Sequence, residues 1–126
     1  MFEFIKKIFR RNGYELTLNR VHDRVAINEN GERLELTVNA DPMRLVAGLN
    51  AAQKKLAAVV NGENPPEEEV RDAAEYFALV IFGKEQTEKL MDFYAGDAAC
   101  VINICGTYFR ERLGKIISKA QKRMKG

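Results

Sequence analysis

The side chains able to do nucleophilic or metal chemistry are few. His22 is the single histidine, and the two cysteines, Cys100 and Cys105, lie five residues apart in an apolar segment. A cysteine–histidine dyad is conceivable, but five helical residues turn through about 500° and point the two thiols apart. We interpret His22 as a turn residue and the cysteines as buried thiols. These three residues do not supply the ligands of a zinc site.

The remaining chemical candidates are carboxylates that follow two prolines. They are Glu67, Glu68, Glu69, Asp72 and Glu75. Side chains at neighbouring positions of a helix point in different directions, so we do not expect these acids to converge on a substrate or metal. We expect them to complement the helix dipole. The sequence contains no glycine-rich phosphate-binding motif and no nucleophile elbow. We therefore expect a protein that is not an enzyme and that uses no cofactor and no metal.

Hydrophobic spacing predicts the elements that carry these residues. Residues 1–12 are expected to form a short amphipathic helix. Apolar and polar residues then alternate within 14–39, which predicts a β meander with a hairpin turn at Asn30-Gly31 and a third strand over 14–21.

Residues 41–126 are predicted to form about four helices. Asp41-Pro42 is a typical helix start, and Gly83 separates a second long helix from a shorter one. Gly96-Asp97 begins the last helix. The expected fold is a single α+β domain over residues 1–126, with a small antiparallel hairpin or meander before a helical bundle.

Charge is unevenly distributed along the chain. The 126 residues carry a formal net charge of +2. Residues 63–92 hold nine acids and three bases, whereas residues 110–126 hold seven bases and one acid. Such segregation favours self-association or docking on an acidic partner.

The last helix has an apolar stripe that continues into its basic end. At 3.6 residues per turn the stripe lasts for about seven turns, roughly 40 Å, which is about the width of such a domain. We therefore expect its end to project as a basic arm and to need a covering partner. The predicted partner-binding residues are Phe2, Ile5, Ile8, Phe9, Leu113, Lys115, Ile116, Ile117, Lys119, Ala120, Lys122, Arg123 and Met124.

The basic, apolar arm suits several kinds of partner. A protein groove, nucleic acid and a solvated end without a partner all remain open, and protein contacts fit best because aromatic platforms for bases are sparse. The longest uncharged run, 98–109, is too short to span a bilayer. The start of the sequence lacks the apolar core of a secretory signal, so an intracellular location is expected.

Three segments give the chain a family resemblance. They are "EKLMDFYAGDAACVINICGTYFRERLGKIISKAQKR" at 88–123, "MRLVAGLNAAQKKLAAVVNG" and the preceding "LELTVNADP". In order and composition they resemble the small tail assembly chaperones of tailed bacteriophages and prophages of the siphovirus type. The resemblance covers roughly residues 30–123.

The resemblance implies a role without chemistry. Such chaperones bind the long, helical and apolar tape measure protein and keep it soluble until tail-tube subunits polymerise around it. It implies a homo-oligomer in the host bacterial cytoplasm that is absent from the mature virion, with the tail-tube protein as a further partner and with no nucleic acid or membrane. Two alternatives stay open: a nucleic-acid-associated protein that binds through its basic C-terminal helix, and a structural head–tail or tail component.

Overall fold

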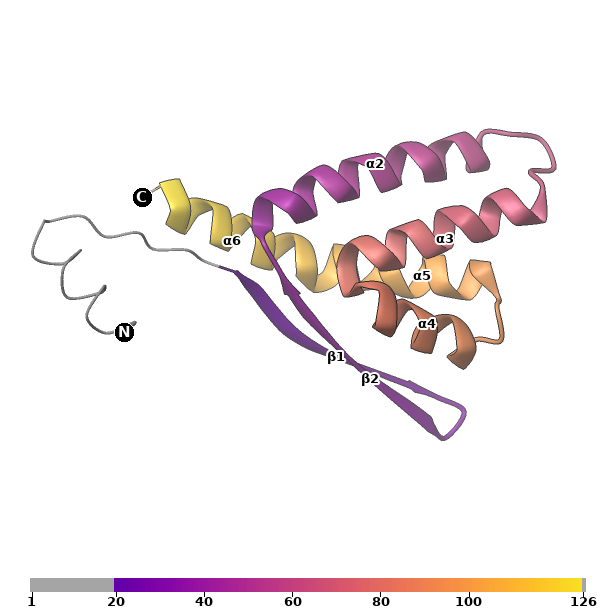
Figure 1. The fold of residues 1–126 in the computed structure, drawn as a ribbon, viewed down its shortest axis with the longest axis horizontal. Coiled ribbons are helices and arrows are strands. Elements are labelled where there is room, and N and C mark those ends of the chain that lie inside the picture. Colours follow the sequence, from indigo (N-terminus) through magenta and orange to yellow (C-terminus); the bar gives the residue numbers. More distant parts are fainter. Residues whose placement is uncertain (1–19, 126) are drawn as a thin grey trace, which may run out of the picture.

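The computed structural model describes the backbone of residues 20–125 and the side chains of residues 20–122. In this part of the chain an antiparallel hairpin precedes a body of helices, and the predicted α+β class is confirmed (Figure 1). The predicted helix over 1–12, with Phe2, Ile5, Ile8 and Phe9, lies outside the described residues.

The hairpin consists of β1 (Val21–Glu29) and β2 (Glu32–Ala40). Asn30 and Gly31 form the turn with φ angles of 51° and 83°. Two consecutive positive φ values define the tight turn that matches the twist of paired strands, so the predicted hairpin is confirmed. Of the third strand predicted over 14–21, Val21 instead begins β1 and Arg20 is in no strand. Residues 14–19 lie outside the described part, so the rest of this strand stays a prediction.

The outer edge of β2 is closed by a side chain and not by a strand. Gln86 Oε1 accepts a hydrogen bond from the Thr37 amide at 2.6 Å, and Gln86 Nε2 donates to the Thr37 carbonyl at 2.5 Å. The carboxamide thus pairs with the backbone as a neighbouring strand would. This contact fixes α4 (Lys84–Phe93), the helix that contains Gln86, against the sheet and blocks pairing with another chain at that point.

Three helices follow the hairpin: α2 (Pro42–Val60), α3 (Glu67–Phe82) and α4 (Lys84–Phe93). The Asp41 carboxylate accepts a hydrogen bond from the Arg44 amide at 3.3 Å and caps α2, as predicted. Gly83, with a φ of 84°, separates α3 from α4.

The last helix is interrupted in a way that the sequence pattern did not predict. It consists of α5 (Ala98–Tyr108), a π-helical turn η1 (Phe109–Leu113) and α6 (Gly114–Lys125). In the turn, the Gly114 amide donates to the carbonyl of Phe109, five residues back. Tyr108 and Leu113 are both buried. Since five residues of α-helix would turn them about 140° apart, the π turn is what keeps both on the core side.

Helix α3 lies at the centre of the body and packs against α2, α4, α5 and β2. The core joins one face of the hairpin to all the helices. Its members are Val21, Ile27, Leu36, Val38, Leu45, Leu49, Ala52, Ala74, Phe77, Ala78, Ile81, Phe82, Leu90, Met91, Val101, Cys105, Tyr108, Leu113, Ile117 and Ala120.

The predicted projecting arm is wrong. Helix α6 packs against α2 and β1 (Figure 1). Leu113, Ile117 and Ala120 are 0%, 5% and 7% exposed, and Ile116 is half-buried. From Leu113 to Ala120 the apolar stripe of the last helix is therefore covered within the monomer, because α2 and β1 pack over it. The Met124 side chain lies outside the described part.

Candidate functional site

A groove lined by both apolar and polar residues lies between α2 and α3, near the end of β2. Its volume is about 490 Å³. Leu45 and Gly48 line it from α2, and Tyr76, Leu79 and Val80 line it from α3. Leu79 is 41% exposed although it is a large apolar residue. The groove is therefore a place where the folded monomer leaves hydrophobic surface in water.

Close packing of the two helices shapes this groove. A Cβ atom built on Gly48 would lie 2.7 Å from Val80 Cγ1 and 3.1 Å from Val80 Cγ2. A side chain at position 48 would therefore collide with α3. Because glycine has none, α2 contributes bare backbone to the groove wall at this point.

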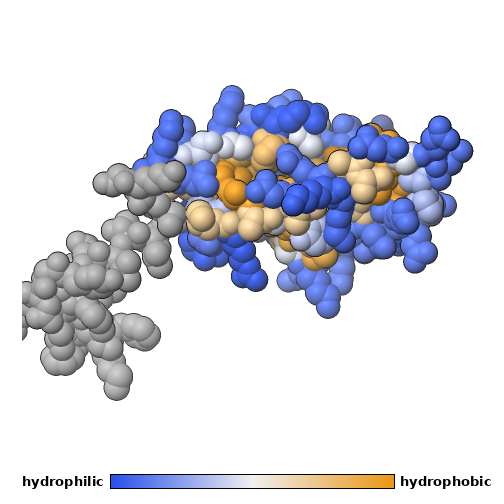
Figure 2. Space-filling model, turned by 90° about the horizontal axis from the view of Figure 1, so that it is seen from above, coloured by the Kyte–Doolittle hydropathy of each residue, from blue (hydrophilic) through white to orange (hydrophobic). Residues whose placement is uncertain are grey.

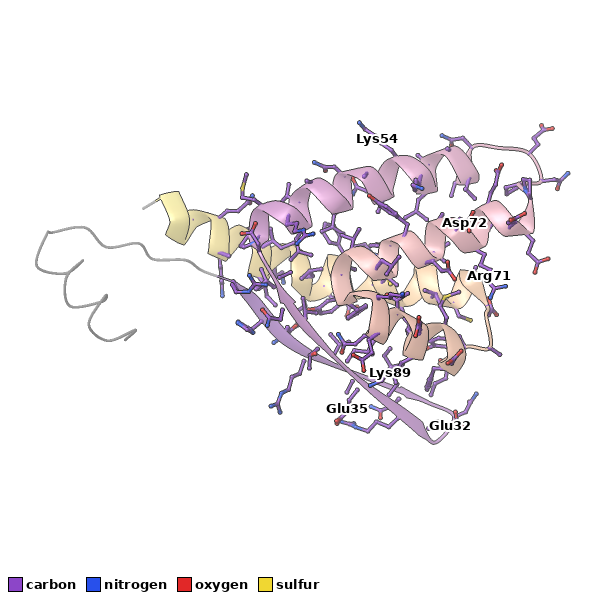
Figure 3. The ribbon with its side chains drawn as sticks, in the orientation of Figure 1. Glu32, Glu35, Lys54, Arg71, Asp72 and Lys89 are labelled. Carbon is purple, nitrogen blue, oxygen red and sulfur yellow. The ribbon has the colours of Figure 1, made fainter. Side chains whose placement is uncertain are left out.

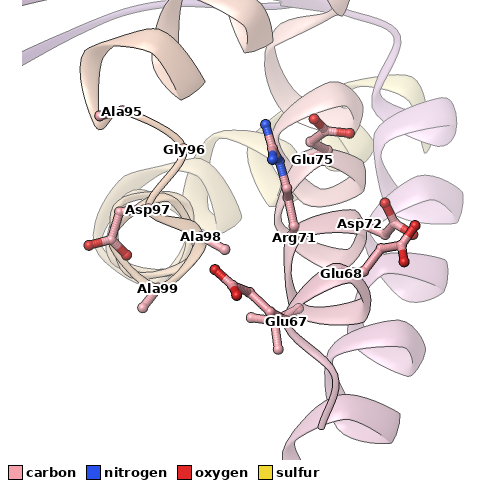
Figure 4. A pocket seen from close by; sticks show the side chains of 11 residues that line it. Glu67, Glu68, Arg71, Asp72, Glu75, Ala95, Gly96, Asp97, Ala98 and Ala99 are labelled. Atoms are coloured by element: carbon pink, nitrogen blue, oxygen red, sulfur yellow. The ribbon is translucent and has the colours of Figure 1, made fainter.

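The charged groups around the groove are mainly positive. Arg20 and Arg44 line it, and the Lys55 ammonium lies 4.7 Å from the centre of the Tyr76 ring. The one acid of the lining, Asp41, already caps α2. Two acids of α3 lie near Tyr76 in the sequence: Glu75 lines other hollows, and Asp72 points to the side of α3 that faces α2 (Figure 4).

Other apolar side chains reach the surface of α2 outside the groove. Met43 and Val60 are 60% and 77% exposed. Figure 2, which looks down on the uppermost helix of Figure 1, shows hydrophobic patches among hydrophilic side chains. Lys54 of α2 points away from the other helices (Figure 3). Charge of this kind keeps a surface with apolar patches hydrated.

A second hollow, of about 1010 Å³, lies between the first turns of α3 and the start of α5. Glu67 points toward α5, whereas Glu68 and Asp72 point to the opposite side of α3 (Figure 4). The carboxylates fan out as predicted. Within residues 20–122, no three histidine, cysteine or acidic side chains are grouped so that they could hold a metal ion.

The structure does not assemble the conceivable cysteine–histidine pair. His22 is exposed on β1, and the hollow that it lines contains no cysteine. Cys105 is fully buried, and this burial raises the pKa of its thiol to about 12. Such a thiol is protonated at neutral pH and is a poor nucleophile. Cys100 is half-buried, and its hydrogen bond with Asp97 raises its thiol pKa as well.

A polar cluster joins the hairpin to the last helix. Arg112 Nε and Nη2 donate to the two oxygens of Asp23 at 2.6 and 2.8 Å, and the Tyr108 hydroxyl donates to Oδ2 at 2.8 Å. The Asp23 side chain is 5% exposed and that of Arg112 is 63% exposed. The hydrogen bond from Arg112 lowers the pKa of the Asp23 carboxyl below 3.8, and burial raises the pKa of Tyr108. We assign this cluster a structural role, because both donors are already satisfied by Asp23.

Replacing Asp23 with asparagine is expected to lower the free energy of unfolding at pH 7 by about 1–2 kcal/mol, because two charge-assisted hydrogen bonds weaken. The carboxyl pKa is lower in the folded state than its ordinary 3.8, so Asp23 stabilises the fold above pH 3.8. This stabilisation is lost as the pH falls through the folded-state pKa.

Urea denaturation of both proteins at pH 7 and at steps below pH 4 tests this prediction. The difference between wild type and Asp23→Asn should shrink as the pH falls. Glu35→Gln is a matched control, because Glu35 pairs with Arg33 at the surface. A difference that stays constant with pH would show that the Asp23 charge does not stabilise the fold.

None of the sequence-predicted partner-binding residues between Leu113 and Lys122 lines the groove. Phe2, Ile5, Ile8 and Phe9 lie outside the described residues. Leu113, Ile117 and Ala120 are core residues, while Lys115, Lys119 and Lys122 are exposed on α6. The side chains of Arg123 and Met124 lie outside the described part. Two signals in the sequence point to the groove: Gly48 in the middle of a long helix, and Leu79 beside the main apolar stripe of α3.

No family model, no curated protein and no solved structure matches this chain. Among residues 20–125, no helix combines the length and apolar character that crossing a bilayer requires.

Proposed function

We propose that this protein is a tail assembly chaperone of a tailed bacteriophage, which binds the tape measure protein and keeps it soluble before the tail tube forms. The proposal combines the family resemblance of residues 30–123 with one observation, the open groove between α2 and α3. A chaperone for a long apolar helix needs exposed hydrophobic surface of limited area inside a charged surround. The groove, with Leu79 at its opening, meets this requirement.

In this proposal the tape measure protein binds a different surface from the one that the sequence predicted. The buried stripe of α6 offers no binding face in the monomer, so the groove replaces it as the client site. A homo-oligomer, contact with the tail-tube protein, location in the host cytoplasm and absence from the finished virion belong to the same proposal.

Co-expression with the tape measure protein encoded in the same operon tests this function. Wild-type chain should keep the tape measure protein in the soluble fraction and co-purify with it. We expect Leu79→Glu to weaken the complex about tenfold or more, because a charge replaces a leucine whose burial contributes about 1.5–3 kcal/mol.

Val60→Glu is the matched control for Leu79→Glu. It places the same charge at an exposed apolar position of α2 that does not line the groove. Circular dichroism should show that both variants are folded. The groove is not the client site if the two substitutions weaken the complex equally, and the function itself is refuted if wild-type chain neither binds nor solubilises the tape measure protein.

A second candidate function, binding to nucleic acid, is favoured by the row of exposed lysines on α6. Lys115, Lys119 and Lys122 follow one another at helical spacing. A gel shift whose affinity falls steeply with salt, and which Lys119→Glu abolishes, would favour this candidate over the chaperone.

A further inference from the structure

We infer that the groove between α2 and α3 selects amphipathic helices whose apolar stripe is flanked by acidic residues. This inference rests on the proposed function only for the helical nature of the partner. Its charge preference comes from the groove itself.

The shape of the groove suits a helix. It runs between two helices that are joined by a short loop and lie side by side (Figure 1). On the α2 side the lining reaches from Asp41 to Gly48, which is about two helical turns or roughly 10 Å. Docked helices commonly place residues at i, i+3, i+4 and i+7 into such a groove. Leu45, Leu79 and Val80 offer apolar contacts to these residues.

The charges of the groove decide what flanks the stripe. Arg20 and Arg44 line it near the end of β2, and Lys55 lies farther along α2 beside Tyr76. Asp41, which caps the Arg44 amide, is the one acid among the lining residues, so two positive charges face one negative charge there. A helix with glutamates beside its stripe meets opposite charge at Arg20 and Arg44, near the end of β2, whereas lysines meet like charge there.

Two synthetic peptides of 18 residues test the inference with the full-length chain. Both carry leucines at i, i+3, i+4 and i+7, and they differ only in having glutamate or lysine beside the stripe. Fluorescence anisotropy at about 50 mM and 300 mM salt gives the four affinities. We expect the glutamate peptide to bind about tenfold more tightly at low salt, with a smaller ratio at high salt.

Variants assign the preference to the groove. Arg44→Glu should reduce the ratio between the peptides to less than about threefold, whereas Leu79→Glu should weaken both peptides. Val60→Glu should change neither affinity. Equal binding of the two peptides by wild-type chain, or an unchanged ratio in Arg44→Glu, would overturn the inference.

Self-association is measured in parallel by light scattering. If neither peptide binds and Leu79→Glu converts an oligomer into a monomer, a second copy covers the groove and the inference is wrong. The result also separates the two proposals. Binding of the tape measure protein without a charge preference refutes only the inference, and a charge preference without tape measure binding refutes only the chaperone function.

Discussion

Replacing Ile117 with alanine is expected to lower the free energy of unfolding by about 3 kcal/mol, because the substitution leaves a cavity where α6 meets α2 and β1. Ile117 is 5% exposed and belongs to the same core as Val21 and Leu45. Since domains of this size are stable by only about 5–15 kcal/mol, the loss is large. Urea denaturation followed by circular dichroism measures it.

Lys119→Ala is the control for Ile117→Ala. It lies two positions further along the same helix, is exposed, and keeps a residue with high helix propensity. We expect it to change stability by less than about 0.5 kcal/mol. Equal and small effects of the two substitutions would mean that α6 does not pack on the body.

Because α6 packs on α2 and β1, removal of residues 114–126 should also destabilise the fold. A chain that ends at Leu113 loses Ile117 and Ala120 from the core and exposes the side chains that they cover. It should unfold without a cooperative transition. A truncated chain that stays folded and loses only partner binding would instead restore α6 as a separate arm.

Replacing Gly48 with valine is expected to destabilise the protein by about 2–3 kcal/mol, because overpacking forces α2 away from α3. The Cβ atom alone would lie 2.7 Å from Val80 Cγ1. Val80 cannot easily turn aside, since a β-branched side chain in a helix has one strongly preferred rotamer. The helix propensity of valine, which is somewhat better than that of glycine, offsets only a small part of the cost.

A double-mutant cycle distinguishes this collision from a general effect of the new side chain. Val80→Ala removes the two Cγ atoms that the new side chain would meet, so Gly48→Val should be less harmful in that background. We expect a coupling energy of about 1 kcal/mol or more. Strictly additive effects would show that the two positions do not touch. Binding of the glutamate peptide should fall in Gly48→Val and recover in the double variant.

Local signals in the sequence predicted most of the described fold. Asn30-Gly31 specifies its turn because both residues tolerate positive φ, and Asp41-Pro42 specifies a helix start through a side-chain cap and a fixed φ. Three acids begin α3 and Gly83 ends it. In each case the residues that carry the signal are neighbours in the chain, so the sequence alone contains the physical cause.

The wrong predictions concern contacts between distant segments. An apolar stripe shows that one face of a helix is covered, but it does not say by what, and Ile117 was therefore assigned to a partner although α2 and β1 cover it. Asp23 and Arg112 are 89 residues apart, so no local pattern connects them. No local pattern indicates the π turn either, although it places Tyr108 and Leu113 on the same buried face.

The groove escaped prediction for a related reason. In the sequence, Val80 lies beside the apolar residues of α3 at helical spacing, which is typical of a core residue. In the structure it is half-buried, and Leu79 beside it is exposed. Whether an apolar residue of a helix faces the core or a groove depends on how closely the neighbouring helix approaches. That distance is set at Gly48, some thirty residues earlier in the chain.

The π turn between α5 and α6 rotates the side chains that follow it relative to those that precede it in the same continuous helix. Residues before it are aligned to α3, and residues after it are aligned to α2 and β1. The number of residues in this turn, and not their chemistry, therefore sets the angular offset between the two halves. Each residue gained or lost there would rotate the lysine row of α6 by about 100° and so redirect the side from which the molecule presents its positive charge.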